Sequence, residues 1–404
     1  MSAGGGAPPA PTRYTAGNDL NQRAHVGGDA DGSRTRRTTK GGAVAFDPVQ
    51  EDCLRLILGH MSRERIFPLD DGAYIARRMS QFEEDPSQLI ETDAERSFHL
   101  TAQAVETTDY RVPLLTDEAE IHREEDAAAD HLREAVDLDP RNWDAKRMLA
   151  ELDAESNDAF LDFLLDGRDE VALDTARAIA AAQDPYGREF ARDLAHRPYL
   201  RWLAAIASRA LISGRYGMAL RVAEESLVYA GDDPAGVRHT AVLAMAKLEV
   251  DPDEIKRFRR RHAQAYQAEN PQRRRHHLTE KELDPWTLIA QMDLAYRALD
   301  YDGANRALRA LVRSCPHAAQ ALYYQTEFPE GLFCRVNVIP GSDDELMVAL
   351  SEATPLLQEG LGSPDNAGFS LWISENDLVA SAISPAERER ERSAAGGRAA
   401  GGEA

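Results

Sequence analysis

Apolar residues recur at helical spacing in three consecutive runs between Leu200 and Leu248. In each run they stand three or four positions apart, which gathers them on one face of an α-helix. Gly214 separates the first two runs, while Asp233 and Pro234 precede the third, where we expect them to cap and begin a helix. The pattern therefore predicts three amphipathic helices joined by short turns. Their expected core positions are Leu203, Ile206, Ala207, Ala210 and Leu211, then Ala219, Leu220, Ala223, Ser226, Leu227 and Ala230, then Val237, Ala241, Ala244, Met245 and Leu248.

Helical patterns of the same kind precede this stretch. Asp47 and Pro48 predict the start of a helix near the beginning of the patterned region, and weaker helices follow it. Gly167 is expected to end a helix that begins near Asn157. These segments extend the expected helical region toward the N-terminus.

The pattern changes after Pro316. Residues 331–340 and 368–373 alternate apolar and polar side chains, which predicts two short β-strands. Between them, Ser342 and Glu345 have the spacing of a capping box, and Pro355 should break or kink the helix that they start. We therefore predict a small α/β cap that covers the open end of the helical array. Its helix would bury Leu346, Ala349, Leu350 and Ala353.

Two short motifs carry a resemblance to a known family. Gly214-Arg215-Tyr216 is followed by Ala219, and Leu299-Asp300-Tyr301 is followed by Ala304. This region resembles the tetratricopeptide (TPR) repeat, in which a turn and an aromatic residue introduce the second helix of a pair. A third, partial copy consists of Ala128, Leu132, Ala135 and Pro140, and lacks the aromatic residue. The resemblance implies antiparallel helix pairs over 117–318, with a generic helical bundle as the alternative.

The expected fold class is mainly α, a TPR-like antiparallel helix-pair solenoid with a small C-terminal α/β cap and disordered termini. The N-terminal tail covers 1–43 and the C-terminal tail 385–404, because both are rich in Gly, Arg and other polar residues and lack periodicity. N-terminal helices fill 44–116, the repeats 117–318 and the cap 319–384. Repeats of about 34 residues leave 268–284 as an insertion with no apolar face.

Composition and charge narrow the expected partners. The 404 residues are 43% hydrophobic and carry a net charge of −22, which favours a soluble protein that repels nucleic acid and anionic membranes. No apolar run approaches the roughly 18 residues that a membrane span needs, and the first residues lack the apolar core of a signal peptide. We therefore expect a cytoplasmic protein that does not enter a membrane.

A basic segment stands out against this acidic background. Residues 255–278 contain eight Lys and Arg side chains and one acidic side chain. They could form a solvated face that pairs with the protein's own acids, a site for an acidic protein partner, or a weak nucleic-acid site. Helical spacing points Phe258 and Tyr266 inward, which disfavours base stacking. The basic patch comprises Lys256, Arg257, Arg260, Arg261, Arg273, Arg274 and Arg275.

No catalytic or cofactor pattern appears in the sequence. We find no nucleophile paired with a base, no phosphate-binding loop and no dinucleotide fingerprint. We predict that all three cysteines, Cys53, Cys315 and Cys334, are small buried residues. The alternative is a reactive thiol at Cys315, which stands close to His317 in the sequence. His276 and His277 stand among arginines and are not expected to bind a metal. We expect no enzyme activity, no cofactor and no metal.

The resemblance to TPR proteins also implies a binding site. In that family the first helix of each repeat lines an inner groove that holds partner peptides. Carried over, the partner-binding residues are Arg201, Arg238, Met245, Trp286, Tyr296 and Arg297, with Trp286 alternatively a core residue. Such a groove suits an extended or helical peptide of acidic character. The predicted function is a non-catalytic scaffold for protein partners. The alternatives are an enzyme or regulator with its active groups in the C-terminal cap, or weak nucleic-acid binding through 255–278.

Overall fold

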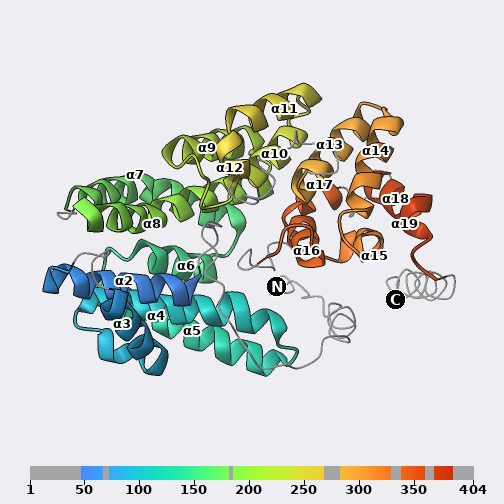
Figure 1. Cartoon of the computed structure of the whole chain (residues 1–404). Coiled ribbons are helices and arrows are strands. Elements are labelled where there is room, and N and C mark those ends of the chain that lie inside the picture. The colour runs from blue at the N-terminus through green and yellow to red at the C-terminus, as the bar shows by residue number, and fades with distance from the viewer. Residues whose placement is uncertain are drawn as a thin grey trace, which may run out of the picture. The chain divides into compact units, whose positions relative to one another are not determined.

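The computed structural model describes residues 47–66, 72–181, 185–267, 283–328, 338–359 and 368–384, with the backbone alone at 185–189 and 267. All of them belong to one unit, 39–404. Within these ranges the chain forms α-helices, a few single-turn helices and no β-strand, which confirms the prediction of a mainly α fold (Figure 1). The short turns are the 3-10 helices η1 (Pro86–Leu89), η3 (Val112–Leu114) and η6 (Gln325–Glu327) and the π-helix η2 (Glu106–Arg111).

The N-terminal helices pack around three small apolar clusters. Asp47 caps the first helix, with Pro48 at its start, as predicted. Leu100, Leu132 and Met148 pack together in a cluster separate from the main core. The helices are α2 (Pro48–Glu64), α3 (Gly72–Glu84), α4 (Asp93–Val105), α5 (Glu118–Leu138) and α6 (Trp143–Asp153).

Helix α7 (Asn157–Ala181) runs straight through Gly167, so the prediction that this glycine ends a helix is wrong. A Cβ atom at Gly167 would stand 2.7 Å from Cζ2 of Trp202, a fully buried residue of α8 (Pro185–Ile212). The Trp202 indole N–H also donates to the carbonyl of Leu164 at 2.7 Å. The glycine is therefore explained by the close approach of two helices rather than by a helix end.

Three pairs of consecutive helices follow, each called a hairpin below, and the first and third pairs pack closely along their length. Helix α8 pairs with α9 (Tyr216–Tyr229), α10 (Val237–Lys247) is followed by α11 (Pro252–Arg261) and the short α12 (Ala263–Gln267), and α13 (Pro285–Arg297) pairs with α14 (Tyr301–Val312). Tyr216 and Tyr301 are the first residues of their helices, which confirms their predicted positions. Ala219 and Ala304, three residues further on, are fully buried.

The same turn ends the first helix of each hairpin. The N–H groups of Arg215, Val250 and Asp300 donate to carbonyls five residues earlier, at 2.7, 3.3 and 2.9 Å. The residue before each donor adopts a left-handed conformation, with φ of 73° at Gly214, 52° at Glu249 and 60° at Leu299. This hydrogen-bond pattern defines a Schellman motif. Only one of the three positions holds glycine, so the sequence alone does not reveal the repetition.

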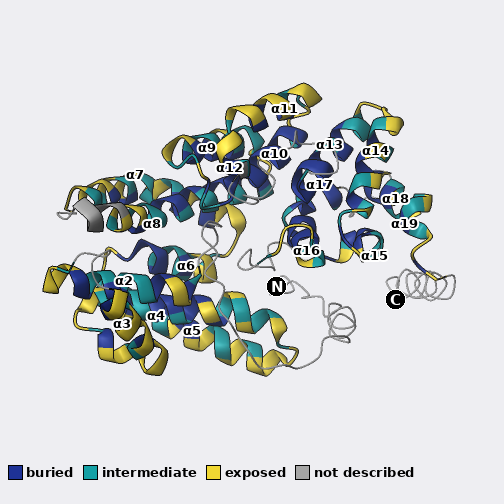
Figure 2. Cartoon of the chain, viewed as in Figure 1, coloured by how far each residue is buried: buried dark blue, intermediate teal, exposed yellow. Residues whose placement is uncertain are grey.

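The third predicted helix differs from its prediction in two respects. Helix α10 begins at Val237 rather than Pro234, although the Asp233 carboxylate still accepts hydrogen bonds from the N–H groups of Val237 and Arg238, at 2.9 and 3.1 Å. It is also buried on all sides from Val237 to Ala246, whereas Leu248 is exposed (Figure 2). Helices α8, α9, α13 and α17 (Thr354–Leu357) surround α10, so the stretch Val237–Ala246 has no solvent-exposed face.

The described residues of the C-terminal region form short helices joined by turns, with no strand among them. Ser342 caps α16 as predicted, and the helix stops at Glu352, just before Pro355. The second predicted strand is wrong, because 368–373 lies within α18. Phe369 and Ile373 are its buried pair, and Leu371 between them is exposed, which is helical spacing. Most of the first predicted strand falls in 329–337, outside the described residues. The helices are α15 (Ala318–Tyr323), α16 (Asp343–Glu352), α17, α18 (Gly368–Glu375) and α19 (Asp377–Ala380).

Candidate functional site

The face predicted to form a peptide groove is covered by the chain's own helices α16 and α17. Helix α16 packs on α13, and α17 packs on α10. The Trp286 indole N–H donates to Glu352 Oε2 at 2.7 Å. Lys247 Nζ lies 2.7 Å from Glu359 Oε1, and Arg297 pairs with the same carboxylate. The groove therefore holds a helical segment with acidic side chains, but that segment belongs to the same chain.

The six predicted partner-binding residues are consequently divided between core and surface. Arg201, Arg238, Met245 and Trp286 are buried or nearly so, which places them out of reach of a partner. For Trp286 the alternative interpretation as a core residue holds, since only 3% of it is exposed. Tyr296 and Arg297 remain partly exposed. The structure thus removes most of the predicted groove from the surface.

Arg201 lies in a buried ion network that joins α2, α6 and α8. Its guanidinium donates to Asp144 at 2.5 and 2.8 Å and to Glu51 Oε2 at 2.9 Å. Arg55 and Arg197 also donate to Glu51, at 2.7 and 3.1 Å. Burial alone would raise the pKa of Glu51, but Arg201 and the other two arginines hold that pKa below its ordinary value. The network fixes the N-terminal helices against α8 and leaves Arg201 no role in binding a partner.

A second buried cluster of charges lies between the second and third hairpins. Arg259 is a buried residue of α11, next to the fully buried Phe258. Its guanidinium donates to Asp284 Oδ2 at 2.6 Å and to Thr287 Oγ1 at 2.7 Å, and it lies 4.2 Å from the ring centre of Tyr266. Burial would raise the pKa of Asp284, but His239 and Arg259 lower it. The cluster holds both ends of the predicted insertion, whose residues 268–282 lie outside the described ranges.

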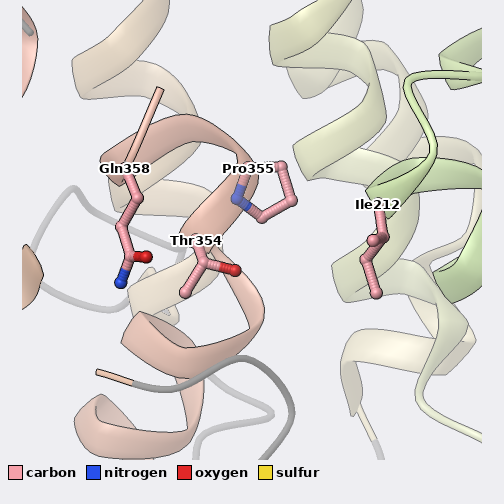
Figure 3. Close-up of a pocket in the computed structure, with 4 residues that line it drawn as sticks. All are labelled: Ile212, Thr354, Pro355 and Gln358. Carbon is pink, nitrogen blue, oxygen red and sulfur yellow. The ribbon is translucent and has the colours of Figure 1, made fainter. Parts of the chain in front are cut away.

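A shallow hollow lies between α8 and α17. Ile212 lines one side, and Thr354, Pro355 and Gln358 line the other, around a space of about 200 Å³ (Figure 3). Figure 3 shows Pro355 of α17 facing Ile212 across this space. The lining offers only a hydroxyl and an amide as polar groups, so it suits no charged ligand.

Aromatic residues gather on the surface beside the turn between α13 and α14. The ring centre of Tyr296 lies 5.9 Å from that of Tyr301, 5.4 Å from that of Trp372 and 5.1 Å from that of the buried Phe369. Leu299 stands in the turn itself and is 71% exposed. We call Tyr296, Leu299, Tyr301 and Trp372 the turn-edge patch. The sequence analysis selected Tyr296 from this set, but for a different surface.

The described half of the basic patch lies exposed on α11. Lys256 and Arg257 pair with Asp253 and Glu254 of the same helix, at 2.8 and 2.5 Å. Arg261 lies 3.6 Å from Glu224 of α9, and Arg260 is exposed beside them. Three of the four cations thus have partners within the chain, which favours the interpretation as a solvated face. Phe258 is fully buried, as predicted. Arg273, Arg274 and Arg275, with His276 and His277, lie outside the described residues.

Cys315 does not have the surroundings of a reactive thiol. Burial, together with the carboxylate of Asp343, raises the pKa of Cys315 to about 12. His317 contacts Asp343 instead, with Nδ1 2.7 Å from Oδ2. The thiolate is the nucleophilic form, so the raised pKa and the burial of Cys315 disfavour a reactive thiol at neutral pH. Cys53 is half-buried, and Cys334 lies outside the described residues.

The described ranges contain neither a candidate metal cluster nor a candidate membrane-spanning helix. No three His, Cys, Asp or Glu side chains come together there in a way that could hold a metal ion. None of the helices in those ranges combines the length and apolar character that a membrane crossing requires.

Comparisons with known proteins identify no relative. No protein-family model, no curated protein and no solved structure matches this chain.

Proposed function

We propose that this chain is a non-catalytic scaffold of the TPR-like type, which binds protein partners in the cytoplasm. The observation that carries the proposal is the repetition of one Schellman turn at the ends of α8, α10 and α13. Repeated hairpins stack through their nearest neighbours and present surfaces that run across several elements, which helical-repeat proteins use to bind partners.

The covering segment gives this proposal further support. The α10 and α13 side of the array is covered by α16 and α17, where Glu352 at the end of α16 meets Trp286, and Glu359 just beyond α17 meets Lys247 and Arg297. An array that holds one helix in this manner can hold another where its surface is uncovered. The partner would then bind outside the covered face, which differs from the groove that the sequence predicted.

Affinity capture with the full chain as bait tests the proposal. We expect specific proteins from a native cell extract to be retained at near-stoichiometric amounts in physiological salt. An unrelated folded protein of equal size and net charge is the control bait, because a charge of −22 attracts basic proteins without specificity. Retention of the same proteins by both baits, or of none by the full chain, would contradict a scaffold function.

A further inference from the structure

Leu299 occupies a position that two physical rules disfavour. Its φ of 60° lies in the left-handed region, where a β-carbon crowds the backbone, and the equivalent turns hold Gly214 and Glu249. Its side chain is also 71% exposed, so it gains little from burial within the chain. For the stability of the fold alone, glycine would be the more favourable residue at this position, because it adopts the left-handed conformation without strain. Strained residues of this kind persist where the surroundings use the side chain for another purpose.

The surroundings of Leu299 supply a rigid apolar surface. Tyr296 and Tyr301 flank the turn on its two helices, and Tyr301 is 47% exposed. Trp372 of α18 approaches Tyr296 from the other side, and Phe369 stacks parallel to it from the core. Aromatic side chains fixed in this way offer contact area at little cost in side-chain entropy, which is typical of the centre of a protein interface.

The rim of the turn-edge patch is acidic. Asp300 and Asp302 begin α14, and Glu375 and Asp377 lie on α18 and α19, all exposed at the surface. The two groups are adjacent, because Asn376 Nδ2 donates to Asn305 Oδ1 at 2.9 Å. Three arginines stand on α13 and α14, namely Arg297, Arg306 and the exposed Arg309, and the first two have acidic partners within the chain. Arg297 pairs with Asp293 and Glu359, and Arg306 lies 3.9 Å from Asp300. An excess of negative charge therefore surrounds the apolar centre.

We propose that the turn-edge patch docks a separate protein through a cationic amphipathic helix; this rests on the proposed scaffold function. The apolar side of that helix seats on Leu299, Tyr301 and Trp372. Its Lys and Arg side chains meet the acids of the rim, in particular Asp302 and Glu375. A helix fits better than an extended peptide, because the described part of the chain has no sheet edge to which a strand could be added.

The test measures binding of a labelled peptide to the full chain by fluorescence anisotropy. The probe is an 18-residue helix of Leu and Lys with leucines on one face, and its twin carries Glu in place of Lys. We expect the Lys peptide to bind the parent and to bind Leu299→Gly about tenfold more weakly, which corresponds to the loss of one buried leucine. The affinity should fall as salt is raised. Leu299→Met should retain binding.

The controls separate binding from folding. Leu114 is also 71% exposed but lies in η3, so Leu114→Gly should leave the affinity for the Lys peptide unchanged. The melting temperature of Leu299→Gly should equal or exceed that of the parent, since glycine relieves the left-handed strain. Equal affinity of the parent and Leu299→Gly for the Lys peptide would overturn the proposal, as would equal binding of the Glu twin.

One further outcome would identify a different occupant. Residues 34–40, RTRRTTK, make the N-terminal tail locally basic. If a peptide of residues 1–46 competes with the Lys probe on the parent but not on Leu299→Gly, the tail occupies the patch and the proposal of a separate partner fails.

Affinity capture distinguishes the docking proposal from the proposed scaffold function. Identical partners on parent and Leu299→Gly baits leave the scaffold function standing without this docking site, whereas no capture by the parent removes the function itself.

Discussion

Glu51 shows how strongly one buried carboxylate can determine the position of a helix. It stands in the first turn of α2 and accepts hydrogen bonds from three arginines, two of which belong to α8. The sequence predicted the helix and its cap, but it could not reveal this network. An acid in the first turn of a helix is also expected for a solvated residue, and only the tertiary contact distinguishes the two.

Replacing Glu51 by Gln should lower the free energy of unfolding by about 3–5 kcal/mol, because Arg55, Arg197 and Arg201 all lose this buried carboxylate and Arg201 keeps Asp144 as its buried counter-charge. Urea denaturation at pH 7 measures the change. Glu118→Gln is the control, since Glu118 is exposed in the first turn of α5. A loss as small as that of the control would mean that water reaches the network. Because the pKa of Glu51 is lowered in the folded protein, the stability that Glu51 contributes is fully present above its ordinary pKa of 4.5. That stability is lost progressively as the pH falls below this value.

Asp293 should produce the opposite pH dependence. Burial raises its pKa to about 6, and Arg297, which it contacts at 3.0 Å, does not fully compensate because it also serves Glu359. The folded state therefore binds a proton more tightly than the unfolded state, and stability should fall as pH rises from about 4 to 7, by up to about 3 kcal/mol. In Asp293→Asn this slope should disappear.

Chemical denaturation of the parent and Asp293→Asn across that pH range isolates the effect of this carboxyl. Asp377→Asn, at an exposed position, should keep the slope of the parent. Parallel curves for the parent and Asp293→Asn would show that Arg297 keeps Asp293 ionised throughout the range.

At the scale of the element, the sequence predicted what repeats locally and missed what depends on packing. Tyr216 and Tyr301 were placed correctly, since a turn followed by an aromatic and a small residue is a local signal. Gly167 was misread, because a glycine at a helix end and one beneath a tryptophan look alike in sequence. The strand predicted at 368–373 failed because six residues are too few to separate a period of 2 from one of 3.6.

The crossing of α8 and α9 gives the sharpest test at this scale. Ala219 is fully buried there, so Ala219→Trp should destabilise the protein by about 1–3 kcal/mol or more by forcing the two helices apart. Thermal unfolding followed by circular dichroism measures this. Arg221→Trp, two residues along on the exposed side of α9, should melt within a few degrees of the parent. If both variants melt alike, the crossing is not tightly packed.

The insertion should be dispensable for stability. Arg259 contacts Tyr266, just before the insertion, and Asp284, at the end of the insertion. Both ends of the insertion are therefore held in place independently of the residues between them. Deleting Gln272 to His277 should change the free energy of unfolding by less than about 1 kcal/mol, because loop closure depends only logarithmically on length. Urea denaturation checks this, and Arg259→Met, which removes the anchor, is the contrasting variant that should destabilise. A large loss on deletion would mean that the segment packs on the folded chain.

At the scale of the whole molecule, the sequence predicted the character of the groove but not its occupant. Trp286 and Arg297 do contact an acidic helical segment, as the resemblance implied for a partner. That segment is residues 343–359 of the same chain, and no local pattern shows where a helix packs along a chain. The turn-edge patch was missed for a related reason, because an exposed leucine reveals its strain only through its backbone angle.

The covering of α10 by α17 also sets an order of events during synthesis. The two helices are far apart in sequence, and a ribosome releases α10 long before α17 exists. For that interval the apolar side of α10 faces water, and closure must await a contact of long sequence separation, which is slow to form. Exposed apolar surface of this kind favours aggregation of incomplete chains. We therefore expect chains that end before α17 to aggregate more readily than the full chain.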